Sequence, residues 1–432
     1  MNRVGRAEAA QAGTQARADV DALVERVRER ILLRPRDTSA NEPLGQGVTP
    51  AVVVAALRAE GVVLADDDMA ALAGRIRQEF DGYGRLTPLL ARPDVTDVLV
   101  NGVHGTWIDT AHGLERVEGL GFRQDAQVRA LAQRLADSVG RRLDDASPWV
   151  DAHLADGTRL HALIPPVSLD GTVLSLRIPA RRGFDLPALQ LAGAIDEHAA
   201  AWLRSVIDAR LTFLITGGTG SGKTTVLGAL LGAVAPSQRI VIVEDSTELN
   251  PVHPHVVRLQ ARPPNAEGAG AVLLRDLVRQ ALRMRPDRIV VGEVRGAEIV
   301  DLLTAFNTGH EGCGGTVHAN EPGDVPARLS ALALTAGVPQ AAVHALMLAG
   351  LEAIVHVRRE RQADGAVLRV IDGIHVVVRD ELGMAQVVPA VSFTRDCGLG
   401  AATVGQPAAG LEVLIRLLRL RGCEPPLLDR VA

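Results

Sequence analysis

A single lysine stands inside a glycine-rich segment whose residue types suit phosphate binding. The segment LITGGTGSGKTT covers residues 214–225, and Lys223 is the one lysine among 46 basic residues, all others being arginine. It fits the pattern G-x4-G-K-[ST], with Gly217, Gly222 and Thr224 at the remaining fixed positions. Backbone N–H groups of such a loop surround phosphate oxygens at the amino end of a helix. The pattern therefore predicts a nucleotide site rather than an ordinary glycine-rich turn.

The lysine suits this crowded position because its ammonium group is compact. A rotatable point charge fits among the backbone groups, whereas a planar guanidinium needs more room and a partner with two acceptor oxygens. Thr224 is expected to be a Mg²⁺ ligand and Thr225 a further phosphate contact. The predicted ATP-binding loop consists of Gly217, Gly218, Thr219, Gly220, Ser221, Gly222, Lys223, Thr224 and Thr225.

Acidic residues follow two other apolar runs, where parallel strands would end. RIVIVEDSTEL contains Glu244, Asp245 and Glu248, and RIVVGE ends in Glu293. The carboxyl ends of parallel strands share one edge of a sheet, where α/β proteins place their chemistry. Glycine precedes Glu293 where a Walker B motif usually has aspartate, so Glu293 is predicted to polarise the attacking water, directly or through the metal. A helix cap or a turn is the alternative role for any one of these acids.

The segment TGHEGCGGTVHAN, residues 308–320, holds further candidate site residues. His310, Cys313 and His318 could suggest zinc, but three ligands at this spacing match no common structural zinc site. Histidines packed in a glycine-rich turn are another alternative. We interpret the segment as a loop near the γ-phosphate, where His310 or His318 senses the nucleotide or contacts a neighbouring subunit.

The elements that would position these residues form an α/β pattern. The apolar runs LTFLIT, RIVIVE, HVVRL, RIVVGE and GTVHA alternate with helical stretches, which is typical of buried parallel strands. The long apolar run from 340 to 357 contains His344 and Glu352, so we expect a core helix leading into a strand rather than a membrane span. ADGA at 363–366 predicts a hairpin.

Changes in residue composition and hydrophobic pattern divide the chain into five predicted parts. Short β-rich runs with a helix near 125–139 predict a small α+β domain before the core. Further upstream, helices are expected at about 49–59 and 68–80. The predicted parts are a mobile tail (1–18), a helical segment (19–82), the α+β domain (83–182), a linker (183–195) and the ATPase core (196–432).

Composition favours a cytoplasmic protein. The net charge of −5 and an aromatic content of 2% leave few basic tracks or stacking surfaces for nucleic acid. Cys313, Cys397 and Cys423 form no CxxC pair, which suits a reducing compartment. The amino-terminal segment lacks the apolar stretch of a signal peptide. We expect neither nucleic-acid binding nor membrane insertion.

The motifs together resemble a known family, the secretion ATPases of the type II/type IV kind. Within it, the chain is most similar to the tight-adherence (Flp) pilus assembly ATPases, over about 88–330. The absence of CxxC pairs, and so of a tetracysteine zinc insert, argues against the type II branch. The matching stretches are VTDVLVNG, VDAHLADGTRLHALIPP, GGTGSGKTT, VIVEDSTEL, VVRLQARPPNAEG, RDLVRQALRMRPDRIVVGEVRGAE and NTGHEGCGGTVHAN.

The resemblance implies a RecA-like P-loop ATPase core behind an N-terminal domain, assembled as a hexameric ring with nucleotide between the two domains. Such a motor would act at the inner face of the membrane, through an inner-membrane complex, in pilus assembly or protein secretion. A nucleic-acid translocase on the same core is the alternative, and DNA-stimulated ATPase activity would support it.

The resemblance also implies roles for particular residues. Glu244 and Asp245 match the acidic box, which with Thr224 would hold Mg²⁺, and Glu293 matches Walker B. The predicted catalytic residues are Glu293, Glu244 and Lys223. His310 and His318 match the histidine box, although Cys313 and Gly315 stand where hydroxyl residues are common. Positions expected to meet phosphate or a neighbouring subunit are Arg159, Arg177, Arg258 and Arg262.

Overall fold

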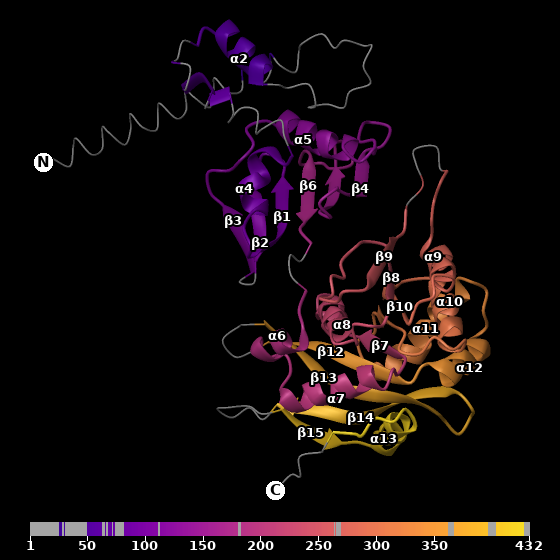
Figure 1. Ribbon diagram of the computed structural model, residues 1–432. Helices are drawn as coiled ribbons and strands as arrows, with labels where there is room; N and C mark the ends of the chain where they lie inside the picture. The colour runs from indigo at the N-terminus through magenta and orange to yellow at the C-terminus, as the bar shows by residue number, and fades with distance from the viewer. Residues whose placement is uncertain are drawn as a thin grey trace, which may run out of the picture. The chain divides into compact units, whose positions relative to one another are not determined.

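The computed structural model divides the chain into two compact units, Met1–Pro179 and Ala180–Ala432 (Figure 1). Each unit has its own sheet and its own apolar core. The predicted tail at 1–18 lies outside the residues that the structure describes. These residues are 26–27, 30, 50–62, 65, 68–70, 72–73, 82–110, 113–179, 183–262, 264, 269–361, 367–395 and 403–426.

The helix predicted at about 49–59 is present as α2 (Pro50–Ala59). Val53 and Leu57 lie one turn apart on it and are fully buried, because residues four positions apart share a face of a helix. They belong to a small apolar cluster that also contains Val27, Ala56, Met69 and Ala73.

A six-stranded antiparallel sheet makes up most of the first unit, in the order β3-β2-β1-β6-β5-β4. This part of the chain has the expected α+β character. Its elements are η1 (Gly84–Leu86), α4 (Thr87–Leu90), β1 (Val95–Asn101), β2 (Thr106–Thr110), β3 (Gly113–Val117), α5 (Asp125–Asp137), β4 (Trp149–His153), β5 (Arg159–Leu163) and β6 (Val173–Arg177).

Strand alternation gives this sheet one buried face. Leu174 and Leu176 of β6 are buried with Val128 and Leu131 of α5 in one core, while the residues between them along the strand are more exposed. Because successive side chains point to opposite faces, Arg177 lies on the face away from this core.

The second unit contains a nine-stranded sheet, in the order β15-β14-β13-β12-β7-β11-β10-β8-β9. The strands from β12 to β9 in this order are parallel, and those from β12 to β15 are antiparallel. The five predicted apolar runs all form strands of the parallel part. The strands are β7 (Phe213–Thr216), β8 (Ile240–Glu244), β9 (Val256–Gln260), β10 (Arg288–Val294), β11 (Gly314–Val317), β12 (Ala353–Arg361), β13 (Val367–Arg379), β14 (Ala385–Arg395) and β15 (Thr403–Pro407).

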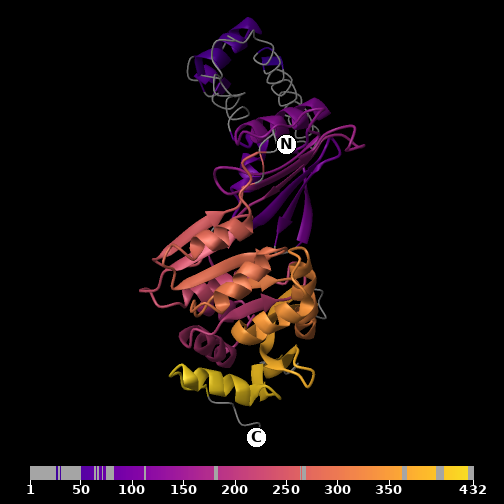
Figure 2. The ribbon, with the colours of Figure 1, turned by 90° about the vertical axis from the view of Figure 1, so that its right-hand side faces the viewer.

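Helices cover both faces of this sheet (Figures 1 and 2). One face packs against α6 (Leu186–Leu191), α7 (Glu197–Asp208), α8 (Lys223–Gly232) and α13 (Leu411–Leu420). The other packs against α9 (Leu274–Ala281), α10 (Glu298–Phe306), α11 (Val325–Leu334) and α12 (Gln340–Gly350), with η2 (Pro322–Asp324) leading into α11. This layered arrangement is the doubly covered α/β fold expected of a RecA-like core.

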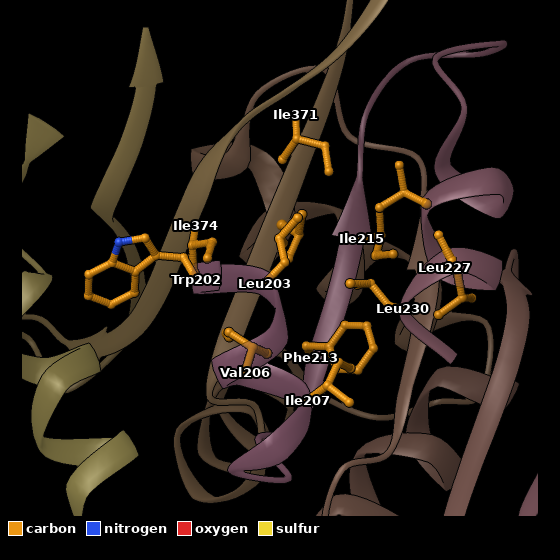
Figure 3. Packing of buried hydrophobic residues seen from close by; sticks show 14 of the residues in the cluster. Trp202, Leu203, Val206, Ile207, Phe213, Ile215, Leu227, Leu230, Ile371 and Ile374 are labelled. Atoms are coloured by element: carbon orange, nitrogen blue, oxygen red, sulfur yellow. The ribbon is translucent and has the colours of Figure 1, made fainter. Parts of the chain in front are cut away.

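The strand β7 is buried from both sides, and its side chains alternate between the two cores. Phe213 and Ile215 point toward α7 and α8, where they meet Leu203 and Leu227 among others (Figure 3). Leu214 belongs to the core on the opposite face. A strand buried on both faces needs a continuous apolar run, which is how LTFLIT reads in the sequence.

The segment predicted as a linker, 183–195, is instead packed against the second unit. Asp185 caps α6 by accepting a hydrogen bond from the Ala188 N–H at 2.8 Å. Leu186 and Leu189 of this helix are buried in the core beside β7. The stretch RIPARRGFDLP, residues 177–187, with two prolines and three arginines, favoured the linker prediction, but the spaced leucines carry the packing.

The last part of the chain, which was least informative as sequence, extends the sheet. The helix predicted from 340 is α12, and β12 follows it as expected. β12 and β13 pair antiparallel from Ala353↔Val376 to Arg361↔Val367, in keeping with the predicted hairpin, whose tip lies outside the described residues. No described helix combines the length and the apolar character needed to cross a bilayer.

Candidate functional site

The glycine-rich loop lies between the end of β7 and the start of α8, so the helix begins at Lys223. Gly217 must be glycine: its φ is +149°, and an added Cβ would be 2.1 Å from the Val357 carbonyl oxygen. The buried hydroxyl of Ser221 has no hydrogen-bond partner within the described residues. A loop at a helix amino end with an unpartnered buried hydroxyl fits a phosphate group.

Lys223 is held in this loop by its own backbone. Its Nζ donates to the carbonyl oxygens of Gly217 at 3.0 Å and Gly218 at 2.9 Å, and lies 3.2 Å from Nδ1 of His318. The side chain is 6% exposed, and burial lowers its pKa, an effect that Glu293 opposes. An ammonium has three N–H donors, and two of them are used by the loop carbonyl oxygens. The third, which is directed at His318, is therefore the donor that can bind a phosphate oxygen.

His318 connects the lysine to the predicted Walker B acid. Its Nε2 lies 2.6 Å from Oε1 of Glu293, whose other oxygen accepts from Arg295 at 2.5 Å. Burial and the nearby lysine charge lower the pKa of His318. The imidazole is therefore neutral at pH 7, and because Nδ1 faces a donor, we assign its proton to Nε2. Burial raises the pKa of Glu293, but Arg295, His318 and Lys223 together lower it by more, so the carboxylate is charged.

Glu244 is buried beside β10 and supports the loop that follows β8. It is 4% exposed, and its Oε1 accepts from the backbone N–H groups of Glu248 at 3.1 Å and Leu249 at 3.0 Å. Burial raises its pKa to about 7. A Cβ at Gly292 would come within 2.6 Å of the Glu244 Cγ. Glycine thus replaces the usual Walker B aspartate because the Glu244 side chain occupies that space.

Thr224, at the end of the loop, places its Oγ1 3.5 Å from Oε2 of Glu248. Asp245 is exposed after the end of β8. The described residues contain no group of three His, Cys, Asp or Glu side chains that could enclose a metal. Mg²⁺ binds through one or two side chains plus phosphate oxygens and water, so it needs few protein ligands. Glu248 joins Thr224, Glu244 and Asp245 as a candidate ligand.

The two histidines of the predicted histidine box do not lie together. His318 follows β11 at the edge of the sheet that carries the nucleotide loop, whereas His310 precedes β11 at the opposite edge. The four residues of β11 span roughly 13 Å. The expectation that His310 lies at the phosphates of its own subunit is therefore not met, and a contact with a neighbouring subunit stays a prediction.

Cys313 and Gly315, which stand where hydroxyl residues are common, both lie in tightly packed surroundings. At Gly315 an added Cβ would be 2.8 Å from the Val291 carbonyl oxygen, so no larger residue fits. Cys313 is fully buried, and its sulfur accepts from the Ile289 N–H at 3.2 Å. Burial raises the pKa of this thiol to about 12, so it stays neutral.

Arg258 and Arg262 come from the edge of the second sheet that is away from β7. β9, which carries Arg258, is an edge strand, and β8, β10 and β11 separate it from β7. Arg258 donates to Leu249 and Asn250, and Arg262 donates to the Gly270 carbonyl oxygen.

Arg159 and Arg177 lie next to each other in the first unit. They are directly opposite across β5 and β6. Arg159 pairs with Asp151 at 2.6 Å, and Arg177 pairs with Asp97 at 2.9 Å. The structure therefore brings these two predicted residues together on one face of the first sheet.

Sequence reasoning missed three arginines beside the loop. Arg295 directly follows β10, and its guanidinium pairs with Glu293 at 2.5 Å. Arg359 and Arg369 come from β12 and β13, where an Nη of Arg359 would lie 3.6 Å from a Cβ on Gly220 and Nε of Arg369 donates to the Gly220 carbonyl oxygen at 3.1 Å. No local pattern reveals that β12 pairs with β7.

Comparison with known proteins identifies related sequences. The pattern of the Type II/IV secretion system protein family matches residues 79–366. A putative conjugal transfer protein of Mycobacterium tuberculosis is 53% identical over 322 residues, covering 72% of this chain and 91% of that protein. The type IV secretion system protein PtlH of Bordetella pertussis is 34% identical over 314 residues, covering 66% of this chain and 92% of that protein.

Among solved structures, the pilus retraction motor PilT with bound ADP has a similar fold. The TM-score is 0.51 at 20% sequence identity, over 66% of this chain and 81% of that chain. The family pattern covers both the six-stranded sheet and the nucleotide loop. The chain therefore belongs to the Type II/IV secretion system protein family, as an ATPase with a RecA-like core.

Proposed function

We propose that this ATPase is a ring-forming motor that couples ATP hydrolysis to pilus assembly or protein secretion through an inner-membrane complex. The observation that carries the proposal is the contact chain from Lys223 through His318 to Glu293. It joins the phosphate-binding cation to the acid that would act on water. A nucleotide scaffold without turnover would not need this connection.

The arrangement supports a division of labour among the side chains. The loop N–H groups and Lys223 bind the phosphates, and the lysine donor now directed at His318 turns to the γ-phosphate. Mg²⁺, held by Thr224 with an acid from the loop after β8, would neutralise developing charge. Glu293 then orients the attacking water, and His318 keeps that carboxylate in position.

Motor function requires more than one subunit in our proposal. Arg159 and Arg177 lie in the first unit, and Arg258 lies at the edge of the second sheet. Arginines that approach the γ-phosphate from another domain or subunit stabilise the charge that spreads in phosphoryl transfer. A hexamer with nucleotide between domains would bring them there, and the tight-adherence pilus systems are the branch that the sequence favours.

A nucleic-acid translocase is the second candidate. The name of the 53% identical relative, a putative conjugal transfer protein, favours it. The acidic net charge and low aromatic content count against direct DNA contact. Measuring ATPase activity with and without DNA decides between them, because a translocase should be stimulated and a pilus or secretion motor should not.

The experiment for catalysis uses the variant Glu293→Gln. We expect it to bind ATP with near wild-type affinity but to hydrolyse it about 100-fold more slowly or worse, because the water is no longer oriented. Nucleotide binding and phosphate release are measured on the same preparation. Loss of binding together with hydrolysis would mean that Glu293 is structural or chiefly holds the metal.

The experiment for the motor role identifies the membrane partner. The full chain carrying Glu293→Gln is expressed in the native host and purified together with the proteins bound to it. An ATPase that binds ATP without hydrolysing it should stay bound to its inner-membrane partner. Co-purification of an inner-membrane protein only when the nucleotide loop is intact supports the proposal. Recovery of DNA instead would favour the second candidate.

A further inference from the structure

The outer side of the nucleotide loop is covered by the β12–β13 hairpin strands. Nε of Arg369 donates to the Gly220 carbonyl oxygen at 3.1 Å. The stem of the same side chain passes the loop again at Gly222, where an added Cβ would be 3.3 Å from the Arg369 Cδ. The tip of the loop is thus held from outside by a residue that no motif contains.

A second arginine stands directly opposite the first. Arg359 and Arg369 are cross-strand partners in the antiparallel pair β12–β13. An added Cβ at Gly220 would be 3.6 Å from Nη1 of Arg359. Like charges directly opposite each other in a sheet destabilise it. Two guanidinium groups are therefore placed together beside the loop at some cost to the fold.

Among the described residues, these two arginines have no acidic partner, in contrast to their neighbour Arg358. Arg358, next along β12 and on its other face, pairs with Glu360 and Asp372, both at 2.6 Å. Within the described residues, no ion pair involves Arg359 or Arg369. Their uncompensated charge lies beside a loop built to bind an anion, so the nucleotide phosphates are the natural counter-charge.

We propose that Arg359 and Arg369 are positioning residues of the nucleotide site. Arg369 holds the loop at Gly220, and the two charges together attract the phosphate chain. β12 lies on one side of β7, whereas β11 and β10, which precede His318 and carry Glu293, lie on the other. The two arginines are therefore remote from the reacting γ-phosphate. They stabilise the nucleotide equally in the ground state and in the transition state. Such uniform binding lowers Kd and KM and does not raise kcat.

The test compares matched variants of the full chain. Arg369→Met removes the hydrogen bond and the charge, Arg369→Lys keeps a donor and the charge, and Arg359→Met removes charge alone. Arg358→Met is the control, because it removes an equally exposed arginine from the same strand. Binding of a fluorescent ADP analogue is measured at several salt concentrations, together with KM and kcat for ATP.

We expect Arg369→Met to weaken ADP binding and raise KM by about tenfold, with kcat changed by less than about twofold. Arg369→Lys should recover most of the affinity. Arg359→Met should weaken binding by several-fold and reduce its salt dependence, because one cation is lost. Arg358→Met should resemble wild type.

Two results would overturn the proposal. One is unchanged ADP affinity in both Arg369→Met and Arg359→Met. The other is a fall in kcat at constant KM, which would place the arginines at the transition state instead. Arg359→Met makes the test independent of folding defects at the loop, since Arg359 donates no hydrogen bond to it. The inference rests on the ATPase site, but ADP binding tests it even if the motor proposal fails.

Discussion

The ammonium of Lys223 has three N–H donors, and the loop itself uses two of them. The backbone carbonyls of Gly217 and Gly218 fix the position of Nζ, and the third donor faces His318. An arginine here would have to place a planar group where the loop closes around one small cation. The use of lysine at this one position in an arginine-rich chain follows from that geometry.

We predict that Lys223→Arg fails almost as completely as Lys223→Ala. The planar guanidinium cannot donate to both carbonyl oxygens and reach phosphate from the same point, so ATP turnover should fall by about 100-fold or more. Steady-state phosphate release measures this, and circular dichroism checks that both variants fold. Hydrolysis at the wild-type rate by the arginine variant would show that our account of the lysine is wrong.

The side chain of Glu244 on β8 fills the space next to Gly292 on the neighbouring strand β10. Glu244 at the end of β8 lies where a Cβ on residue 292 of β10 would stand. The buried carboxylate in turn holds the loop after β8 by two backbone hydrogen bonds. The acid of one strand and the glycine of the other therefore depend on each other.

We predict that Gly292→Ala destabilises the protein by about 1–3 kcal/mol, because the added methyl group overlaps Glu244. Chemical unfolding measures the change. Gly323→Ala is the matched control, since an added Cβ there meets nothing within 4 Å. The double variant with Glu244→Ala should recover part of the loss, and strictly additive effects would mean that the two positions are not coupled.

The pair β12–β13 buries two histidines near the loop. His356 lies 2.9 Å from the hydroxyl of Thr216, the last residue before the loop, and His375 is 8% exposed on the neighbouring strand. Burial, and then the nearby His356, lowers the pKa of His375 to about 4, although Asp372 opposes the shift. His375 is therefore neutral in the folded protein.

We predict that acid unfolds this protein partly through His375. An unfolded histidine has a pKa near 6.5, so below that pH the unfolded chain binds a proton that the folded chain does not. Stability should be full above pH 6.5 and fall as the pH drops to about 4, by roughly 3 kcal/mol from this group. Urea unfolding at pH 7.5, 6 and 5 measures the slope.

The variant His375→Leu should reduce that slope between pH 6.5 and 4. The exposed His255 provides a control, because His255→Leu removes a histidine that the fold does not bury. An unchanged pH dependence in His375→Leu would show that other groups account for the acid sensitivity.

Each of the two units carries one arginine pair directly opposite across antiparallel strands. In the first unit Asp97 and Asp151 neutralise Arg177 and Arg159, whereas the pair in the second unit has no acidic partner in the described chain. If Arg159 and Arg177 left their aspartate partners to bind phosphate, they would contribute to the site only when nucleotide is present. In our proposal, assembly into a ring brings this about.

We predict that Arg159→Ala or Arg177→Ala chains depress the activity of wild-type chains when mixed with them. In a ring the arginine acts on a site that its own chain does not complete alone, so the loss should exceed simple dilution. Specific activity should also rise with protein concentration. The mixing series and mass photometry measure both effects, with Arg129→Ala, which removes a half-buried arginine of the same unit paired with Asp145, as control. Constant activity per chain down to a demonstrated monomer would exclude the ring.

Motifs whose residues are adjacent in the chain could be predicted from the sequence alone. The loop from Gly217 to Thr225, the strand-end acids and the doubly covered sheet follow from local patterns, because a phosphate loop needs its glycines, its lysine and its flanking strand and helix in one short segment. The family resemblance rested on the same contiguous motifs. Glu293 and His318 were recognised because each directly follows an apolar run.

Tertiary structure alone decided the relations that depend on strand order and on space. Pairing of β12 with β7 brings Arg359 and Arg369 to the loop, although more than 130 residues separate them from it. The length of β11 divides His310 from His318, and the bulk of Glu244 explains Gly292. These contacts arise from strand neighbours and packing volumes, which are set by the whole sheet and leave no periodic signal in the sequence.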